Sequence, residues 1–529
     1  MDLDRVLRGG LVVDGTGARA YPADVGLRGG RIAAIGDLAA APAGHRLRVD
    51  GRIVCPGFID MHSHSDLSLF LCPTGDSKIR QGVTTEVVGN CGFSPAPVTP
   101  ESAADVRGLH GFFGSFVYDL GWDWRSYGDF AARLDGACPS LNVAPLVGHV
   151  TLRTTVMGYA QRPPTADELA RMKTLLRQAM AQGAFGLSTG LVYPPGAYAD
   201  TEELVELARV SGEAGGVYAS HIRGEGHSLL RAVAEAIEVG ERGRVPVEIS
   251  HHKAAFRPHW GRIRQAIQLS EWARERGQNV SFDVYPYTAG SAPLTQIVPD
   301  WGHEGGLGTL LERLREPGSR ARLVKEIGEQ GREWDQTIVA WMPGGPGKAD
   351  EGQSLAAVAA RRGVDPITAL FQLLEESEAR AIMVHFVMSE DDVRAVMRHP
   401  LAMFGSDGWV LAPEGLLAEG KPHPRCYGTY PRILGHYVRD VGLLTVEEAV
   451  HKATYRPAEK LGLRTKGRVQ VGADADLVVF DPAAVREEAT YADPHRFPVG
   501  IEHVLVGGEP TVRDGRHTGA RVGRVLRRP

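Results

Sequence analysis

The stretch GFIDMHSHSD, residues 57–66, places two histidines directly after a short apolar run. His62 and His64 are two residues apart, so on an extended chain both side chains point to the same side, as two ligands of one metal would. Strands that deliver polar residues at their carboxyl ends are typical of a parallel β/α barrel, where the loops after the strands form the active site. A single His-x-His pair is a weak signal, and the other strands must be inspected for the same pattern.

Seven further apolar runs alternate with helical patterns downstream of this stretch: TTEVVG, NVAPLVG, AFGLSTG, GVYASH, PVEISH, VSFDVYPY and LAMFGSD. This alternation is typical of a parallel sheet wrapped by helices. Thr165-Ala-Asp-Glu168 matches a capping box, and Asp200-Thr-Glu-Glu203 opens a second helix in a similar way. The eight runs predict an α/β fold of the TIM type, a (β/α)₈ barrel.

The two ends of the chain have a sequence pattern that differs from that of the alternating region. Short β-rich runs broken by Gly, Asp or Pro fill residues 1–56, and runs of the same kind return in residues 464–529, which end in the basic tail RVLRRP. Such runs are typical of antiparallel strands joined by tight turns. We therefore expect the two ends to meet in one small β-sandwich.

An unusually long interval, residues 289–380, separates the seventh run from the eighth. Ordinary strand-to-helix connections are much shorter. The interval contains helical stretches and a Gly/Pro-rich break at residues 343–347, so it is interpreted as an inserted lid. The catalytic barrel is then expected in two parts, residues 57–288 and 381–463.

Charge and cysteine content restrict the class of partner and the compartment. Lys and Arg total 59 against 64 Asp and Glu, a net charge of −5, which argues against nucleic-acid or anionic-membrane partners. The N-terminus MDLDRVLRGGLVVDG lacks the pattern of a signal peptide, and no stretch approaches the length of a membrane span. The five cysteines are odd in number and scattered, which argues against a disulfide framework. A cytoplasmic protein with a small-molecule substrate is expected.

Further candidate metal ligands follow other predicted strands. Cys91 comes after the second run, His221 after the fifth, His251 after the sixth and Asp407 after the eighth. A lone His or Cys beside an apolar run is usually a packed side chain, and Ser-Asp-Gly at Asp407 is also good turn chemistry. Their shared placement at the ends of separate strands nevertheless favours one metal site.

A Cys/His/His set matches a tetrahedral zinc site with one position left open, as catalysis requires. Zinc lowers the pKa of its water to about 7 in favourable sites and so makes hydroxide available at neutral pH. Asp407 is predicted to be the general base, which takes a proton from this water and then delivers it to the departing amine nitrogen. Lys253, two residues after His251, fits either a surface salt bridge or a contact with the substrate.

Several long motifs occur along the chain in a fixed order. VCPGFIDMHSHSD and, far downstream, GRVQVGADADLVVFDP resemble the amidohydrolase superfamily. GNCGFSPAP, GAFGLSTGLVYPPGAYADTEEL, SHIRGEG, EISHHK, DVYPYTAG and FGSDG with HPRCYGTYPR resemble, more narrowly, the D-aminoacylase (N-acyl-D-amino-acid deacylase) family. The resemblance spans nearly the whole chain and implies zinc-dependent hydrolysis of N-acyl-D-amino acids. The preference for D over L comes from the resemblance alone.

The resemblance also implies which residues hold metal. A tightly bound zinc is implied on Cys91, His221 and His251, and a second, weaker metal position on His62, His64 and Asp407. Many other superfamily members bridge two metals with a carboxylated lysine after the fourth strand. That strand reads AFGLSTGLVY here and contains no lysine, so Cys91 is expected to take the bridging place.

The substrate carboxylate is held in this family by an arginine and tyrosines. These match Arg425 of HPR, Tyr193 of LVYPPG and Tyr285 of DVYPY. A guanidinium binds a carboxylate through a bidentate pair of hydrogen bonds, which also fixes the orientation of the substrate. Packing inside the barrel is the alternative role for each tyrosine.

Two other functions stay open at this point. A cyclic-amide hydrolase of the dihydroorotase or hydantoinase type would be favoured by a dinuclear site with a carboxylated lysine. A non-catalytic metal-binding sensor could use the same scaffold, although the presence of all six candidate ligands and Arg425 argues against it. The acyl group, the amino-acid side chain and the oligomeric state, homo-oligomer included, are left open.

Overall fold

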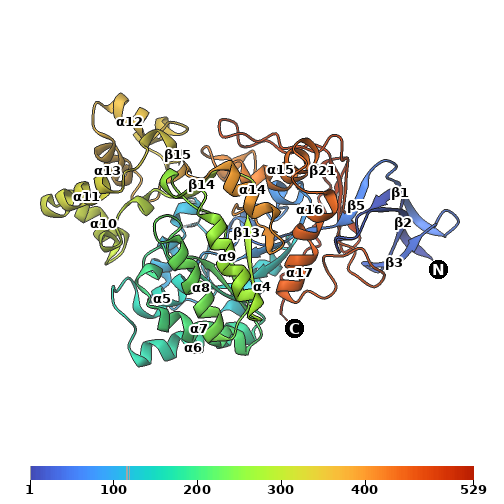
Figure 1. Cartoon of the computed structure of the whole chain (residues 1–529), viewed down its shortest axis with the longest axis horizontal. Helices are drawn as coiled ribbons and strands as arrows, with labels where there is room; N and C mark the ends of the chain where they lie inside the picture. The colour runs from blue at the N-terminus through green and yellow to red at the C-terminus, as the bar shows by residue number, and fades with distance from the viewer. Residues whose placement is uncertain (1, 115–116, 118, 529) are drawn as a thin grey trace.

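The computed structural model describes residues 2–114, 117 and 119–528 and has three regions along its longest axis (Figure 1). A β/α barrel occupies the middle. The N-terminal strands lie at one end of the molecule, and a largely helical insert lies at the other. The three regions match the barrel, terminal β module and insert that the sequence predicts.

The barrel contains eight strand positions, one for each predicted run. They are β6 (Phe58–Asp60), β7 (Val83–Val88), β8 (Asn142–Pro145) continued by β9 (Val147–Gly148), β10 (Gly186–Gly190), β11 (Val217–His221), β12 (Val247–Ile249), β13 (Val280–Val284) and β17 (Ala402–Phe404). Every assigned pairing between neighbours is parallel. The Met61 N–H donates to the Phe404 carbonyl at 3.2 Å and joins β6 to β17. The predicted eight-stranded barrel is confirmed.

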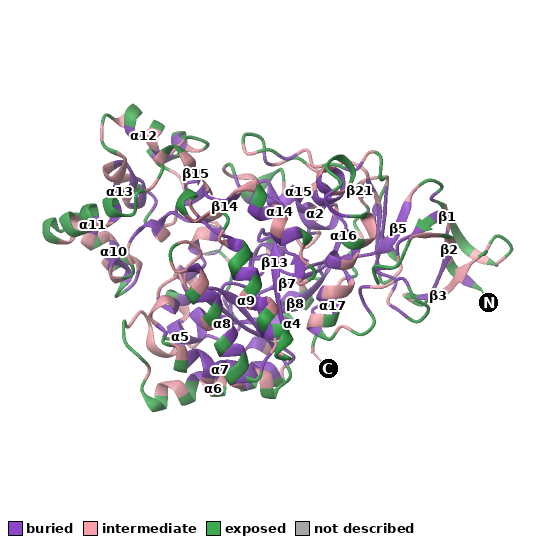
Figure 2. Ribbon diagram, in the orientation of Figure 1, coloured by how far each residue is buried: buried purple, intermediate pink, exposed green. Residues whose placement is uncertain are grey.

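Helices cover the outside of the barrel. Neighbours in this layer include α6 (Ala166–Ala181), α7 (Thr201–Glu213), α8 (Leu229–Gly243), α9 (Ile263–Glu275) and α14 (Glu390–Arg398). Their inward faces are buried and their outward faces exposed (Figure 2), as expected for amphipathic helices. Thr165 and Glu168 form the predicted capping box of α6, and Asp200 caps α7.

The insert has a small antiparallel sheet and a core of its own. Its strands are β14 (Ala289–Pro293), β15 (Thr337–Trp341) and β16 (Ile382–Phe386), and its helices are α10 (Leu307–Arg315), α11 (Pro317–Glu329), α12 (Leu355–Arg362) and α13 (Pro366–Glu376). Most buried side chains of these elements form a hydrophobic cluster of their own, whereas Trp341, Ile382 and Val384 of the sheet pack with the main cluster that includes the barrel. The sheet extends past the predicted end of the insert at residue 380, because β16 pairs with β14 and β15.

Strands from both chain ends form one nine-stranded sheet. The N-terminal strands are β1 (Leu3–Val12), β2 (Tyr21–Arg28), β3 (Arg31–Gly36), β4 (Ala43–Arg48) and β5 (Ile53–Pro56), and the C-terminal ones are β18 (Leu477–Phe480), β19 (Ile501–Val506), β20 (Glu509–Arg513) and β21 (Arg516–His517). The antiparallel pair β5–β18 joins the two sets. Side chains from both ends, such as Leu7, Val54 and Leu477, share one core. The two ends therefore meet as predicted, within a single hydrogen-bonded sheet.

The last residues of the chain differ from the prediction, which assigned the tail RVLRRP to the terminal β module. Val525 instead forms a parallel bridge with Val143 in β8, and the Leu526 N–H donates to the Val143 carbonyl at 2.7 Å. The Arg528 N–H donates to the Gly183 carbonyl at 3.0 Å. Residues 524–528 thus bind to the barrel through backbone hydrogen bonds and through the side chains of Val525 and Leu526, which pack against its hydrophobic clusters.

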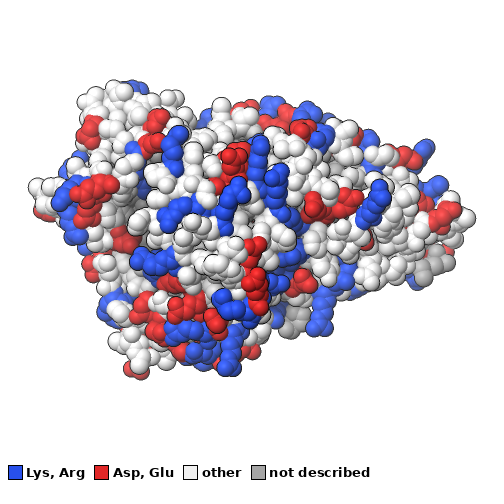
Figure 3. Space-filling model, in the orientation of Figure 1, with Lys and Arg blue, Asp and Glu red and all other residues white. Residues whose placement is uncertain are grey.

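The surface carries both signs of charge. On the face drawn in Figure 3, Lys and Arg side chains of the described residues are interspersed with Asp and Glu, in line with the net charge of −5. None of the helices in the described part of the chain is long and apolar enough to cross a membrane.

Candidate metal centre

One thiol and three imidazoles converge at the carboxyl ends of the barrel strands. The Cys91 Sγ lies 3.3 Å from His62 Nε2, 3.4 Å from His251 Nε2 and 3.7 Å from His221 Nδ1. All four residues are buried. Since they come from four different strand ends, the predicted convergence of Cys91, His221 and His251 is present, and His62 joins it.

These distances suit a zinc ion. With Zn–S near 2.3 Å and Zn–N near 2.0–2.1 Å, a tetrahedral zinc separates a sulfur and a nitrogen ligand by about 3.6 Å. The ligand atoms of His62, Cys91, His251 and Asp407 all lie within 4.8 Å of one another. Cys91, His251 and Asp407 also have positive φ angles of 52°, 35° and 52°, an uncommon conformation that clusters at functional sites. The donor set therefore fits the metal that the sequence predicts.

Asp407 and His64 extend the cluster on one side. Asp407 Oδ1 lies 3.1 Å from His64 Nε2 and 3.5 Å from His62 Nε2. The two predicted ligand sets therefore share one chamber, in which Cys91 touches His62 as well as His221 and His251. Cys91 has the central position that a bridging ligand would need.

The backbone leaves no room for a side chain at the end of the fourth strand. A Cβ atom added to Gly190, the last residue of β10, would lie 2.0 Å from the carbonyl oxygen of Cys91. Such a contact is far inside van der Waals distance, so residue 190 must be glycine while the Cys91 loop holds this position. The loop after β7 thus closes over the end of β10.

Glu225 is a member of the cluster that sequence reasoning missed. Its Oε1 lies 3.1 Å from His251 Nδ1 and 3.7 Å from His221 Nε2, and the three residues form a second group with metal-ligand spacing. Glu225 is four residues after His221 in SHIRGEG, and an acidic residue at that distance from a predicted ligand is the available signal. Carboxylates that accept a hydrogen bond from a ligand histidine fix its tautomer and orientation.

Lys253 is buried in this cluster. Its Nζ lies 2.5 Å from Glu225 Oε1 and 2.7 Å from His251 Nδ1. Of the two interpretations left open by the sequence, the surface salt bridge is wrong, because only 8% of the residue is exposed. The ion pair with Glu225 places the ammonium beside the ligand histidines.

Asp283, at the end of β13, orients two ligands at once. Its Oδ2 lies 3.3 Å from His62 Nδ1, and its Oδ1 accepts a 2.8 Å hydrogen bond from the His251 N–H. Asp283 precedes the predicted substrate residue Tyr285 by two positions, and the sequence alone did not single it out. Such outer contacts are a regular part of metal sites.

A buried ion cluster lies beneath the ligand loops. Lys78 Nζ lies 2.8 Å from Asp60 Oδ2 and 3.1 Å from Glu86 Oε1, and all three side chains are fully buried. The same ammonium donates to Ser406 Oγ at 2.6 Å and to the Gly408 carbonyl at 3.3 Å. Lys78 therefore connects the strand that leads to His62 with the loop that carries Asp407.

Burial and neighbouring charges set the protonation states of the chamber. Burial lowers the pKa of His221 to about 4 and also lowers the pKa of His251, so both imidazoles are neutral at pH 7, the form that binds metal. Burial by itself would raise the pKa of Asp407, but the Arg425 guanidinium and nearby histidines hold it well below its ordinary value. Burial raises the pKa of the Cys91 thiol, an effect that His62 opposes. A bound metal cation would favour the thiolate form.

Arg425 and the two tyrosines predicted to bind substrate lie around the chamber. Arg425 Nη1 is 2.8 Å from Asp407 Oδ2, and its guanidinium lies 4.9 Å from the ring centroid of Tyr285. The Tyr193 ring centroid is 5.0 Å from that of His221. The Tyr285 hydroxyl is buried and makes no hydrogen bond within the described residues. All three side chains are therefore close to the candidate metal ligands.

Comparisons with known proteins agree with this geometry. An amidohydrolase family model matches residues 49–512. D-aminoacylase of Alcaligenes xylosoxydans xylosoxydans is 40% identical over 99% of this chain and 98% of that protein. The chain belongs to the D-aminoacylase family of amidohydrolases. A second family member from the same organism, N-acyl-D-glutamate deacylase, is 41% identical over 99% of this chain and 97% of its own length.

A solved structure of the family has the same fold. N-acyl-D-glutamate deacylase from Bordetella bronchiseptica, complexed with zinc and a phosphonate inhibitor that mimics the tetrahedral intermediate, is 38% identical and has a TM-score of 0.82. The match covers 100% of both chains. The two chains therefore share the whole of this fold.

Removing the buried ammonium tests its structural role. Lys78→Met leaves Asp60 and Glu86 buried together without a counter-charge, so the free energy of unfolding should fall by about 3–5 kcal/mol. Urea denaturation followed by circular dichroism measures this loss. Lys348→Met is the matched control, because the Lys348–Glu351 pair is partly exposed and is worth about 0–1 kcal/mol. Equal losses in the two variants would contradict the role assigned to Lys78.

Proposed function

We propose that this protein is a zinc-dependent deacylase that hydrolyses N-acyl-D-amino acids to a carboxylate and a free D-amino acid. The observation that carries the proposal is the Cys91 thiol, surrounded by three imidazoles at zinc-ligand spacing, beside the Asp407 carboxylate. Family relatives with D-aminoacylase and N-acyl-D-glutamate deacylase activity, aligned over nearly their full lengths, support it. A cytoplasmic location, in keeping with five free cysteines, remains a prediction, and the oligomeric state stays open.

Cys91, His221 and His251 would hold the tightly bound zinc, and His62, His64 and Asp407 would form a second, weaker position. A bound zinc ion would act as a Lewis acid toward the scissile carbonyl. It would also lower the pKa of water, which makes hydroxide available at neutral pH. Glu225 and Asp283 would keep the histidines in place, since each contacts ligand imidazoles or their backbone.

Asp407 is assigned the proton transfers. The nearby Arg425 and histidines keep its carboxylate ionised at neutral pH, the form that a general base requires. Asp407 takes a proton from the attacking water and passes it to the amine nitrogen as the C–N bond breaks. Without the second transfer the amine would have to leave as an anion.

Arg425 is assigned to the substrate carboxylate, with Tyr285, Tyr193 and Lys253 around it. The planar guanidinium of Arg425 lies over the Tyr285 ring, which limits its rotation and suits bidentate binding of a carboxylate. Fixing the carboxylate and the scissile amide together leaves only two placements for the Cα hydrogen and the side chain. This constraint gives the enzyme a basis for separating D from L substrates.

A panel of N-acetyl-D- and N-acetyl-L-amino acids tests the activity. We expect amine release from D substrates and rates lower by about a hundredfold for L substrates, because a misplaced scissile group costs about that factor. Chelation of the metal should abolish release, and added Zn²⁺ should restore it. Equal rates for both enantiomers would remove the D assignment, and full activity after chelation would remove the metal.

Asp407→Asn separates proton transfer from metal binding. The amide cannot accept a proton from water, so kcat should fall by about 10²–10⁴, while metal analysis still finds about one tightly bound zinc per chain. Asp391→Asn, an exposed aspartate on α14, is the control and should keep wild-type rates. Substantial turnover by Asp407→Asn would contradict the assignment of the base.

Arg425→Ala tests the carboxylate anchor. The loss of charge-assisted hydrogen bonds should raise KM by roughly 10- to 100-fold, and kcat should fall with it because the same contact orients the substrate. Arg425→Lys, which keeps the charge but not the bidentate geometry, should recover only part of the loss. An unchanged KM in steady-state kinetics of Arg425→Ala would place the carboxylate elsewhere.

A further inference from the structure

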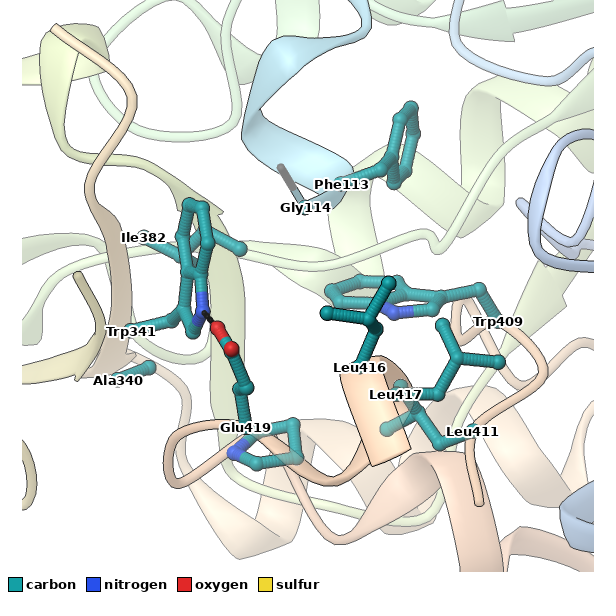
Figure 4. Close-up of a pocket in the computed structure, with 11 residues that line it drawn as sticks. Phe113, Gly114, Ala340, Trp341, Ile382, Trp409, Leu411, Leu416, Leu417 and Glu419 are labelled. Carbon is teal, nitrogen blue, oxygen red and sulfur yellow. Dashed lines mark hydrogen bonds between the residues drawn. The ribbon is translucent and has the colours of Figure 1, made fainter. Parts of the chain in front are cut away.

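An apolar pocket lies beside the candidate metal centre (Figure 4). The barrel loops and the insert both contribute to its walls. Its main lining side chains are Phe113, Trp341, Ile382, Trp409, Leu411 and Leu417. In Figure 4, Trp341 and Ile382 of the insert lie on one side of this space, and Trp409 with the leucines lies on the other. None of the catalytic roles assigned above uses these residues.

The pocket shares a wall with the ligand chamber. The Phe113 ring centroid lies 5.6 Å from that of His64 and 5.6 Å from that of Trp409. Trp409 follows Asp407 by two residues. The pocket is therefore on the side of the metal centre occupied by His64.

The two oxygens of Asp407 divide the chamber into two sides. Oδ1 lies 3.1 Å from His64 Nε2, whereas Oδ2 lies 2.8 Å from Arg425 Nη1. An N-acyl amino acid has its carboxylate and its acyl chain on opposite sides of the scissile amide. With the carboxylate at Arg425 and the amide at Asp407, the acyl chain points toward His64 and hence toward the pocket.

The apolar side chains that line the pocket favour binding of an apolar acyl group. The aromatic and aliphatic side chains named above are buried, with the largest exposure, 9%, at Phe113, whereas Leu416, which also lines the pocket, is 51% exposed. At the edge of the pocket, Glu419 already accepts a 2.9 Å hydrogen bond from Trp341 Nε1 and lies 3.6 Å from Lys348 Nζ. A polar or charged acyl group would lose its hydration here without gaining partners.

We propose that this pocket binds the acyl group of the substrate and restricts it to short, apolar chains, an inference that rests on the proposed deacylase function. The cavity volume is about 30 Å³, and on this scale one water molecule needs about 10–15 Å³. The pocket therefore accommodates a chain of about two to three carbon atoms beyond the carbonyl. The amino-acid side chain lies outside it, on the Arg425 side of Asp407.

A series of acyl groups on one D-amino acid tests the pocket: formyl, acetyl, propionyl, butyryl and hexanoyl. For the wild-type enzyme, kcat/KM should rise by about fourfold per buried methylene as far as propionyl or butyryl, and then fall. Trp341→Ala enlarges the pocket and should raise the ratio of kcat/KM for hexanoyl over acetyl by about tenfold or more. Leu417→Phe fills it and should move the optimum toward formyl and acetyl.

Matched controls distinguish a change in preference for the acyl group from a change in preference for the amino-acid side chain. Trp272→Ala, a half-exposed tryptophan on α9, should leave every ratio unchanged. With acetyl held constant, the ratios among different D-amino acids should stay within about twofold of wild type in the pocket variants. If Trp341→Ala does not fold, Trp341→Phe replaces it in the test. This variant should raise the hexanoyl-to-acetyl ratio of kcat/KM by a smaller factor. Unchanged acyl ratios, or altered side-chain ratios instead, would overturn the proposal.

A binding measurement keeps this test independent of catalysis. Titrating the zinc-loaded wild-type protein with butyrate should change tryptophan fluorescence, because Trp341 and Trp409 line the pocket, and Leu417→Phe should weaken that binding by about fourfold or more. If Leu417→Phe weakens butyrate binding but the protein hydrolyses no N-acyl amino acid, the deacylase function is rejected and the pocket is retained as a short-chain carboxylate site. Hydrolysis with butyrate binding insensitive to Leu417→Phe would reject the pocket and retain the deacylase.

Discussion

The contact between the first and last strands of the barrel is the constraint on which the metal centre depends. Beyond β6 and β17, the Asp407 N–H donates to the His62 carbonyl at 2.7 Å and the His64 N–H donates to the Gly408 carbonyl at 2.9 Å. These backbone bonds bring together residues more than 340 positions apart. The chamber therefore exists only when the barrel is closed, although the insert separates β13 from β17 in the chain.

Closure of the barrel alone would leave the ligand side chains free to rotate. Contacts with buried charged residues restrict that rotation. Lys78, Asp283 and Glu225 each contact a ligand residue or a loop that carries one. Buried ions are costly unless they are paired and hydrogen-bonded, so each of these contacts fixes geometry as well as charge. Two further buried ion pairs of the chamber, Lys253 with Glu225 and Arg425 with Asp407, act in the same way.

The parts that could be predicted from sequence are those with a local signal. Each barrel strand is an apolar run, and Cys91, His221 and Asp407 follow such runs directly, so strand order and candidate ligands were predictable together. Glu225 was missed because only the folded loop returns it to His251. The strand Ile382–Phe386 resembles a barrel strand in composition, and its pairing with β14 and β15 is non-local. The C-terminal tail was misplaced because its contacts with the barrel are non-local, made by backbone groups and by the side chains of Val525 and Leu526.

The separate hydrophobic core of the insert has a consequence for how such an enzyme can diversify. Leu310, Leu370 and Met383 belong to that core and not to the cluster inside the barrel, so the effects of substitutions there on stability should add to those of substitutions in the barrel. The same segment contributes Trp341 and Ile382 to the space near the reacting groups. Selection on substrate range can therefore act on a semi-autonomous module, while the barrel that carries the chemistry keeps its inherited geometry.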